Sequence, residues 1–227
     1  MGRTTLDKQV ISKKRVADHG EVLTAEREVN AMLHLVRHET ERIDSRFLEP
    51  ACGTGNFLVP ILEKKLNSIK AKYSKSQLEF ERYSVVATGS IYGVEILADN
   101  VRECQERLFS VFNDLYTALY KKHSKDSCRD AIRFILRRNI LHGDALSLKT
   151  VSEEKTPIIF SEWTLVGGSK IKRRDFTFAE LIPGNKENEG LFVDTQVSDT
   201  GSPVFIPKSV KDYPLTHFLT LAYETTN

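Results

Sequence analysis

The 227-residue sequence has few cysteines, and none of them are spaced for a zinc site. Cys52, Cys104 and Cys128 are odd in number and far apart, and no C-x-x-C occurs. Disulfide frameworks in small secreted domains need several cysteines in even number, and structural zinc sites need closely spaced cysteines. We therefore expect a reduced, cytoplasmic protein of bacterial or phage type that holds no metal.

Long apolar runs and an excess of charge are also missing. No stretch approaches the ~20 apolar residues of a membrane span, and the basic N-terminus lacks the apolar region of a secretory signal. The net charge is only +2, which argues against a strongly basic nucleic-acid binder but leaves a local patch open. Hydrophobic residues make up 40% of the chain, enough for the core of one α/β domain with an appendage.

Apolar spacing predicts helices that alternate with short buried strands. Thr24 is the predicted N-cap of the first helix. The charged segment 71–90 is expected to be an irregular extension. Helices are expected at about 25–42, 56–72, 97–121 and 128–137, and strands at 46–49, 90–96 and 138–141.

This alternation predicts a Rossmann-like, doubly wound and mostly parallel sheet. We expect a flexible segment at 1–23, a ligand-binding domain at 24–150, and a β-hairpin with an extended C-terminal arm at 151–227. The hairpin should turn at Gly167–Gly168, and 183–203 is expected to be a linker.

The stretch RFLEPACGTGNFLVP, residues 46–60, predicts a ligand-binding turn between a strand and a helix. Gly53 and Gly55 permit positive φ and close approach of a ligand to the backbone. The turn lacks the lysine of a phosphate-binding loop, and Leu58 stands where a dinucleotide fingerprint needs its third glycine. Glu49 would repel a pyrophosphate and suits a ligand with an amino group.

Two further acids end the next two predicted strands. Glu95 can accept hydrogen bonds from both hydroxyls of a ribose, and Asp144 can accept one from the exocyclic amine of adenine. Together with Glu49, these acids predict a binding pocket for S-adenosylmethionine, an adenosine that carries an amino-acid-like cation. Two simpler readings stay open: Glu95 as a surface carboxylate, and Asp144 as a turn residue.

EPACGTGNFL resembles the first motif of the adenine-specific DNA methyltransferases of restriction–modification systems. YGVEI resembles their second motif, GDAL their third, and HGEVLTAEREVNAML the segment before the sheet, so the resemblance covers residues 16–148. It implies an S-adenosylmethionine-dependent methyltransferase fold, in which Ile96 would pack on the adenine ring. The cofactor-binding residues so implied are Glu49, Pro50, Ala51, Cys52, Gly53, Thr54, Gly55, Asn56, Phe57, Glu95, Ile96, Asp144, Ala145 and Leu146.

The sequence departs from this family at two places. Leu23–Thr24–Ala25 replaces the usual F-T-P. The motif Asn/Asp-Pro-Pro-Tyr/Phe, whose amide and aromatic ring hold the flipped base, is absent, because none of the seven prolines is adjacent to another. PIIFSEW, with Ser161 and Glu162, occupies its approximate place. The catalytic residue is therefore unknown, and the chain is a fragment, a subunit that needs a partner, or a cofactor-binding protein that no longer transfers methyl groups.

Other polar residues carry weaker signals. Lys170, Lys172, Arg173 and Arg174 form a basic patch that would contact DNA phosphates or simply be solvated. His34 and His38 lie four apart on a predicted helix, and a solvated helix face explains them better than a metal. Cys52 is expected to pack rather than react. Trp163 fits the core or an interface better than base stacking.

The sequence as a whole predicts a DNA adenine methyltransferase domain that needs a protein partner for target recognition and for the missing motif. The alternative is a non-catalytic S-adenosylmethionine-binding or docking subunit of a larger DNA-modification complex. A decayed gene product that still folds is a third reading.

Overall fold

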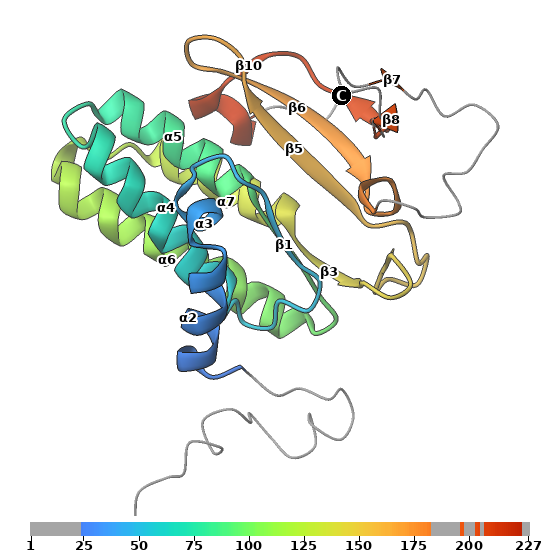
Figure 1. Cartoon of the computed structure of the whole chain (residues 1–227). Coiled ribbons are helices and arrows are strands. Elements are labelled where there is room, and N and C mark those ends of the chain that lie inside the picture. The colour runs from blue at the N-terminus through green and yellow to red at the C-terminus, as the bar shows by residue number, and fades with distance from the viewer. Residues whose placement is uncertain (1–23, 183–195, 198–202, 205–206, 224–227) are drawn as a thin grey trace, which may run out of the picture.

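The computed structural model describes residues 24–182, 196–197, 203–204 and 207–223 (Figure 1). The expected segment 1–23 and most of the expected linker lie outside these residues. The first half of the described chain contains α2 (Glu26–Leu35), α3 (Arg37–Glu41), β1 (Phe47–Glu49), α4 (Leu58–Tyr73), α5 (Gln77–Gly89), β2 (Ile91–Glu95), α6 (Ala98–Tyr120), the 3-10 turn η2 (Lys121–His123), α7 (Asp126–Asn139) and β3 (Ile140–Asp144).

The second half is mostly β-structure. Its elements are β4 (Lys149–Thr150), β5 (Ile159–Leu165), β6 (Lys170–Thr177), the 3-10 turn η3 (Ala179–Leu181), β7 (Gln196–Val197), β8 (Pro203–Val204), β9 (Lys211–Asp212), β10 (Thr216–His217) and the 3-10 helix η5 (Phe218–Tyr223). The hairpin β5–β6 turns at Gly167–Gly168 as predicted, and both glycines have positive φ.

The main sheet has the order β1-β2-β3-β4. The pairs β1–β2 and β2–β3 are parallel, and β4 adds an antiparallel pair at the end of β3. A second, antiparallel sheet has the order β10-β6-β5, with β9 also paired to β6. The mixed α/β class and the mostly parallel sheet are therefore confirmed.

Strand β2 is buried on both faces, and its side chains alternate between two layers. Ile91 packs in the cluster formed by the helices. Tyr92 and Val94 point the other way and pack with Ile158 and Phe160 of the hairpin region. Figure 1 shows α4 to α7 gathered on one side of β1 and β3, and β5–β6 on the other.

This layering differs from a doubly wound sheet, in which helices cover both faces. In the described residues, the hairpin covers the second face of β2, so a Rossmann-like arrangement is not confirmed. Both hydrophobic clusters contain residues from either side of position 150, such as Ile91 and Trp163 in one and Val94 and Phe160 in the other.

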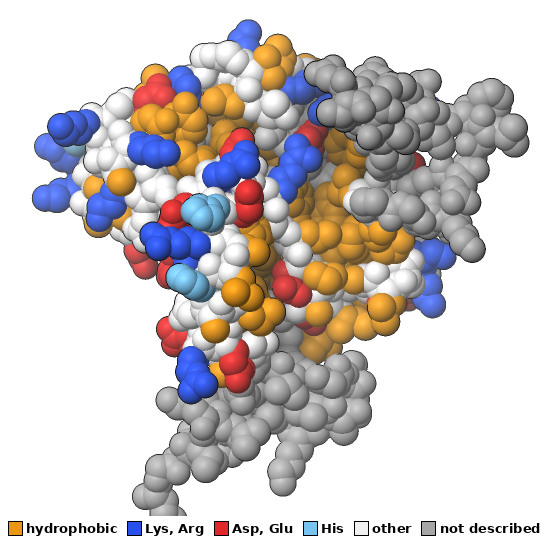
Figure 2. Space-filling view, in the orientation of Figure 1, with side chains coloured by type: hydrophobic (Ala, Val, Ile, Leu, Met, Phe, Trp, Pro, Cys, Tyr) orange, Lys and Arg blue, Asp and Glu red, His pale blue; other side chains and the backbone are white. Residues whose placement is uncertain are grey.

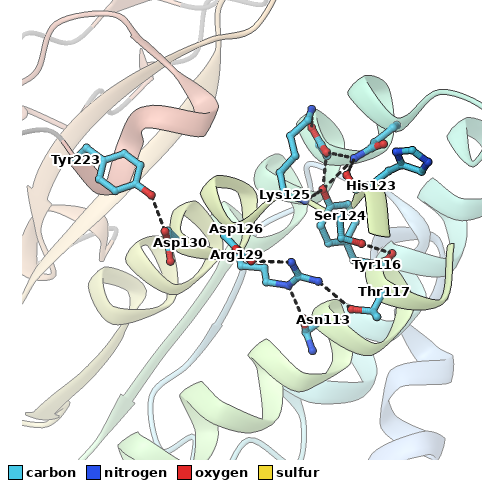
Figure 3. A network of polar contacts seen from close by, with 12 residues as sticks. Asn113, Tyr116, Thr117, His123, Ser124, Lys125, Asp126, Arg129, Asp130 and Tyr223 are labelled. Carbon is cyan, nitrogen blue, oxygen red and sulfur yellow. Dashed lines mark hydrogen bonds and ion pairs between the residues drawn. The ribbon is translucent and has the colours of Figure 1, made fainter. Parts of the chain in front are cut away.

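The segment 71–90 was predicted wrongly, because most of it is the well-formed helix α5. Ser76 caps this helix by accepting a hydrogen bond from the Glu79 N–H. The Glu81 side chain is fully buried, and its carboxylate accepts hydrogen bonds from Tyr116, Gln77 and Lys125. Lys125 and Tyr116 belong to the polar network drawn in Figure 3. Tertiary partners on α6 and in the turn before α7 thus allow a helix whose buried face is partly polar.

Two smaller predictions about the N-terminal helix were also wrong. The N-cap is Ala25, with no side-chain cap, rather than Thr24. The predicted single helix is split at Val36, whose φ of −111° and ψ of 28° end α2 before α3 begins.

The last part of the chain docks on the helices and is not an arm throughout. Phe218 and Leu221 of η5 are fully buried in the helix-side cluster. The Tyr223 hydroxyl donates a hydrogen bond of 2.6 Å to Asp130 of α7 (Figure 3). Trp163 is buried, and its indole N–H donates to Asn139, which confirms the core reading. None of the helices in the described part of the chain combines the length and apolar character needed to cross a bilayer.

Lys65 of α4 fixes the segment that leads into β1. Its side chain is fully buried, and Nζ donates to the carbonyls of Arg42, Ile43 and Ser45 at 2.6 to 3.1 Å. The ammonium also lies 5.2 Å from the centre of the Phe47 ring. These contacts replace the water that a buried cation loses.

We expect Lys65→Met to lower the free energy of unfolding by about 2–4 kcal/mol, because three buried carbonyls lose their donor. Urea denaturation measures this change. Lys70→Met is the matched control, since Lys70 is exposed on the same helix, and it should change the free energy by less than about 0.5 kcal/mol. Equal effects of the two substitutions would contradict the anchoring role.

Candidate ligand-binding site at the glycine turn

The turn between β1 and α4 depends on two glycines with left-handed backbone. Gly53 has a φ of 51° and Gly55 a φ of 90°. The turn is held to the sheet by the Cys52 N–H, which donates to the Val94 carbonyl at 3.0 Å, and it closes on itself where the Gly55 N–H donates to the Cys52 carbonyl at 2.8 Å. A Cβ at Gly55 would lie 2.9 Å from the Cys104 sulfur, so this position excludes side chains for steric reasons as well.

Cys52 packs beneath the turn. Its side chain is buried, and its sulfur would lie 2.9 Å from a Cβ at Gly93 of β2. The neighbouring Cys104 thiol and burial raise the pKa of Cys52. Cys52 therefore stays a neutral thiol, as the packing interpretation predicts, and it is no nucleophile.

Glu95 ties the turn to the end of β2. Its side chain is buried, one carboxylate oxygen accepts from the Gly53 N–H at 2.8 Å, and the other accepts from the Leu97 N–H at 2.9 Å. One carboxylate thus joins the two loops that follow β1 and β2. Charged acceptors make stronger hydrogen bonds than neutral ones, so Glu95 is a structural element of the site as well as a candidate ligand contact.

Glu49 has little compensation for its burial. The one hydrogen bond to its carboxylate in the described chain comes from the Ala51 N–H at 3.3 Å. Burial raises the pKa of Glu49 above the ordinary carboxyl value. A positive group of a ligand would supply the partner that the protein does not. Pro50 and Ala51 are exposed beside it.

Arg107 of α6 holds the far side of the turn, and the sequence offered no signal for it. Its guanidinium donates to the Thr54 carbonyl, the Thr54 hydroxyl and Asn56 Oδ1 at 2.7 to 3.0 Å. The Asn56 side-chain amide donates in turn to the Thr24 carbonyl. The chain segment before the sheet therefore lies against the turn. Helix α4 follows Phe57 with no side-chain cap. In its first turn the Val59 and Ile61 N–H groups donate to the Gly55 and Phe57 carbonyls, and Pro60 has no N–H.

The third predicted acid, Asp144, is organised as a turn residue. Its carboxylate accepts from the Leu146 N–H at 2.9 Å, and the Ser147 hydroxyl and that N–H lower the pKa of Asp144. Ala145 packs against the hairpin-side cluster and Leu146 is almost fully exposed. Ile96 is 45% exposed and accepts a hydrogen bond at its carbonyl from the His142 ring.

The register brings the three acids to one edge of the sheet. Glu49 pairs with Gly93, two residues before Glu95, and Glu95 pairs with His142, two residues before Asp144. Paired residues of parallel strands project to the same face, so all three acids share the helix-side face. No hydrogen bond within the described residues joins Asp144 to the turn. The three carboxylates at this edge can accept hydrogen bonds from hydroxyl and ammonium groups of a ligand.

Three of the four residues of the predicted basic patch are engaged with acids. Arg173 is buried and forms an ion pair with Asp175 at 2.8 Å. Arg174 pairs with Glu162 at 2.5 Å, and Lys172 lies 3.5 Å from Asp212. Lys170 is exposed. These pairings neutralise much of the charge that would attract a phosphate backbone.

His34 and His38 are both exposed on α2 and α3. Across the described ranges, no three His, Cys, Asp or Glu side chains are grouped so that they could hold a metal ion.

Comparison with known proteins gives no match to a family model, to a curated protein or to a solved structure.

The Glu49 carboxyl group should lower the free energy of unfolding as the pH rises. When the pKa of a carboxyl is raised in the folded state, the free energy of unfolding falls as the pH rises from the ordinary pKa to the raised pKa. Above the raised pKa the loss is complete and stays constant. We therefore expect Glu49→Gln to raise the urea midpoint at pH 7, with no difference below pH ~4. Glu63→Gln, at an exposed site of α4, is the control. A lower midpoint for Glu49→Gln at pH 7 would refute this expectation.

Gly55→Ala should be more costly than Gly168→Ala. Both glycines have positive φ, but a Cβ at Gly168 meets nothing within 4 Å. We expect the difference in unfolding free energy to be about 1–3 kcal/mol, from overpacking against Cys104. Adding Cys104→Ala should recover part of the loss in a double-mutant cycle. Equal losses at the two glycines would place the whole effect in backbone strain.

Proposed function

We propose that this chain is the S-adenosylmethionine-binding part of a cytoplasmic DNA adenine methylation system. The observation that carries the proposal is the pair of positive-φ glycines at one sheet edge with Glu49, Glu95 and Asp144 on the same face. The ammonium of the ligand would meet Glu49, the ribose hydroxyls Glu95, and the adenine amine Asp144. The carboxylate of the ligand would meet the backbone of the glycine turn.

The electrostatics of the edge favour this ligand over a phosphate. Glu49 and Glu95 would repel a pyrophosphate. The half-buried Glu49 carboxylate has one long hydrogen bond, so an ammonium would relieve the cost of its burial. The sulfonium methyl is already electrophilic, and transfer to an exocyclic amine then requires mainly positioning.

A partner would complete the reaction. Residues 157–163, the approximate place of the missing motif, enter β5, which pairs antiparallel with β6 over the second face of β2. In the described part of the chain, β1 pairs only with β2. The amine-holding motif would therefore come from another chain, together with most of the DNA recognition.

Calorimetric titration with S-adenosylmethionine tests the proposal. We expect micromolar binding by the wild-type chain, and a loss of about tenfold or more in Asp144→Ala, because one charged hydrogen-bond acceptor is removed. Glu95→Gln should weaken binding as well, since one of its oxygens becomes an amide donor. Asp114→Ala, an exposed site on α6, should bind as the wild type does.

Circular dichroism on the same samples separates loss of the site from loss of the fold. A folded wild-type chain that binds no S-adenosylmethionine would overturn the proposal and favour a docking subunit. Binding without methyl transfer to unmethylated DNA is the expected behaviour of the chain alone. Transfer by the chain alone would overturn the requirement for a partner.

A further inference from the structure

A pocket lies between the C-terminal end of α7, the strand β3 and the hairpin. Its volume is about 480 Å³. None of its lining residues belongs to the glycine turn. The pocket is lined by Phe134, Arg137, Arg138, Leu141, Ile159, Ser161 and Asp175.

Two arginines in this pocket have unused donors. In the part of the chain that the structure describes, neither the Arg137 nor the Arg138 side chain forms a hydrogen bond or an ion pair. The Arg138 Nε is fully buried and has no acceptor. Its guanidinium lies over the Phe134 ring, 4.8 Å from the centroid, so the donor edge of the group is held in one plane. An unpaired buried N–H of a charged group is costly.

The one carboxylate in the pocket is already engaged. Asp175 accepts two hydrogen bonds from Arg173 at 2.8 and 3.0 Å, one from Ser161 and one from Tyr213. The pocket is therefore lined by two guanidinium groups and one carboxylate, and that carboxylate is already paired with the guanidinium group of Arg173. Burial, and then the nearby charge of Arg173, lower the pKa of Arg138.

The helix dipole does not account for this arrangement. Cations are favourable in the last turn of a helix, and this explains an exposed arginine such as Arg137. It supplies no acceptor for the buried Arg138 Nε and no counter-charge for two neighbouring guanidinium groups. A bound anion with several acceptor oxygens would supply the counter-charge, and its oxygens would accept hydrogen bonds from the guanidinium groups.

We propose that this pocket binds the phosphate group of a nucleotide or of a nucleic-acid strand. Arg137 and Arg138 would donate to the phosphate oxygens. Leu141 and Ile159, with the Phe134 ring, form apolar walls against which a sugar or base would pack. The inference does not depend on the proposed cofactor site, because the two sites share no residue.

Nuclear magnetic resonance of the arginine Nε groups tests this directly. The probes are inorganic phosphate, deoxyadenosine monophosphate and a 12-base-pair DNA duplex. We expect each ligand that enters the pocket to shift the Arg138 Nε–H signal. Arg138→Gln should weaken its binding about tenfold or more, because a charge-assisted hydrogen bond is lost. Arg102→Gln, at an exposed site on α6, should change the affinity less than twofold.

The three probes distinguish the source of the phosphate. Weakened duplex binding in Arg138→Gln would identify a nucleic-acid strand, and weakened binding of the mononucleotide alone would identify a free nucleotide. Arg137→Gln serves as a second variant if Arg138→Gln does not fold. An Arg138 Nε–H signal that none of the three probes moves, or equal affinities of wild type and both variants, would overturn the proposal.

Discussion

The two-sided burial of β2 is the constraint on which the rest of this structure depends. Alternate residues of a strand must face opposite sides, so Ile91 enters the helical core while Tyr92 and Val94 meet the hairpin. A shift of one residue in register would exchange the two sets. The same alternation places Glu95 on the helix side, where the glycine turn lies. One strand therefore sets both the layering of the fold and the position of the candidate site.

Hydrogen bonds between residues distant in sequence hold the candidate site together. They fix its backbone, but they leave the Glu49 carboxylate with little compensation for its charge. Glu95 joins the loops after β1 and β2, and Arg107 fixes Thr54 and Asn56 from α6. Glu49 stands apart, because its burial is compensated by one long hydrogen bond. A framework held this firmly can keep one acid in an unfavourable state, which is how proteins often prepare a group for a ligand.

The sequence predicts what local patterns encode, and fails where tertiary partners decide. Apolar periodicity located α4 and α6, and paired glycines located the β5–β6 turn. Helix α5 was missed because Glu81 looks like a solvent-facing charge, while Lys125, Tyr116 and Gln77 make its burial acceptable. Arg107 and Lys65 could not be recognised, since their partners are backbone carbonyls and side chains distant in sequence. The spacing of Glu95 and Asp144 did indicate their shared edge, because parallel strands end together.

The hairpin gives a physical reason to look for function outside the glycine turn. It covers the face of β2 that helices would cover in a doubly wound sheet, and it leaves β1 paired with β2 alone among the described strands. By packing against α7, it also encloses Arg138, and it directs Asp175 toward Arg173 rather than toward Arg138. The same placement of β-structure where helices would lie therefore leaves β1 with one paired strand among the described residues and creates a pocket with two arginines beside β3. Both effects follow from where one antiparallel pair of strands is packed.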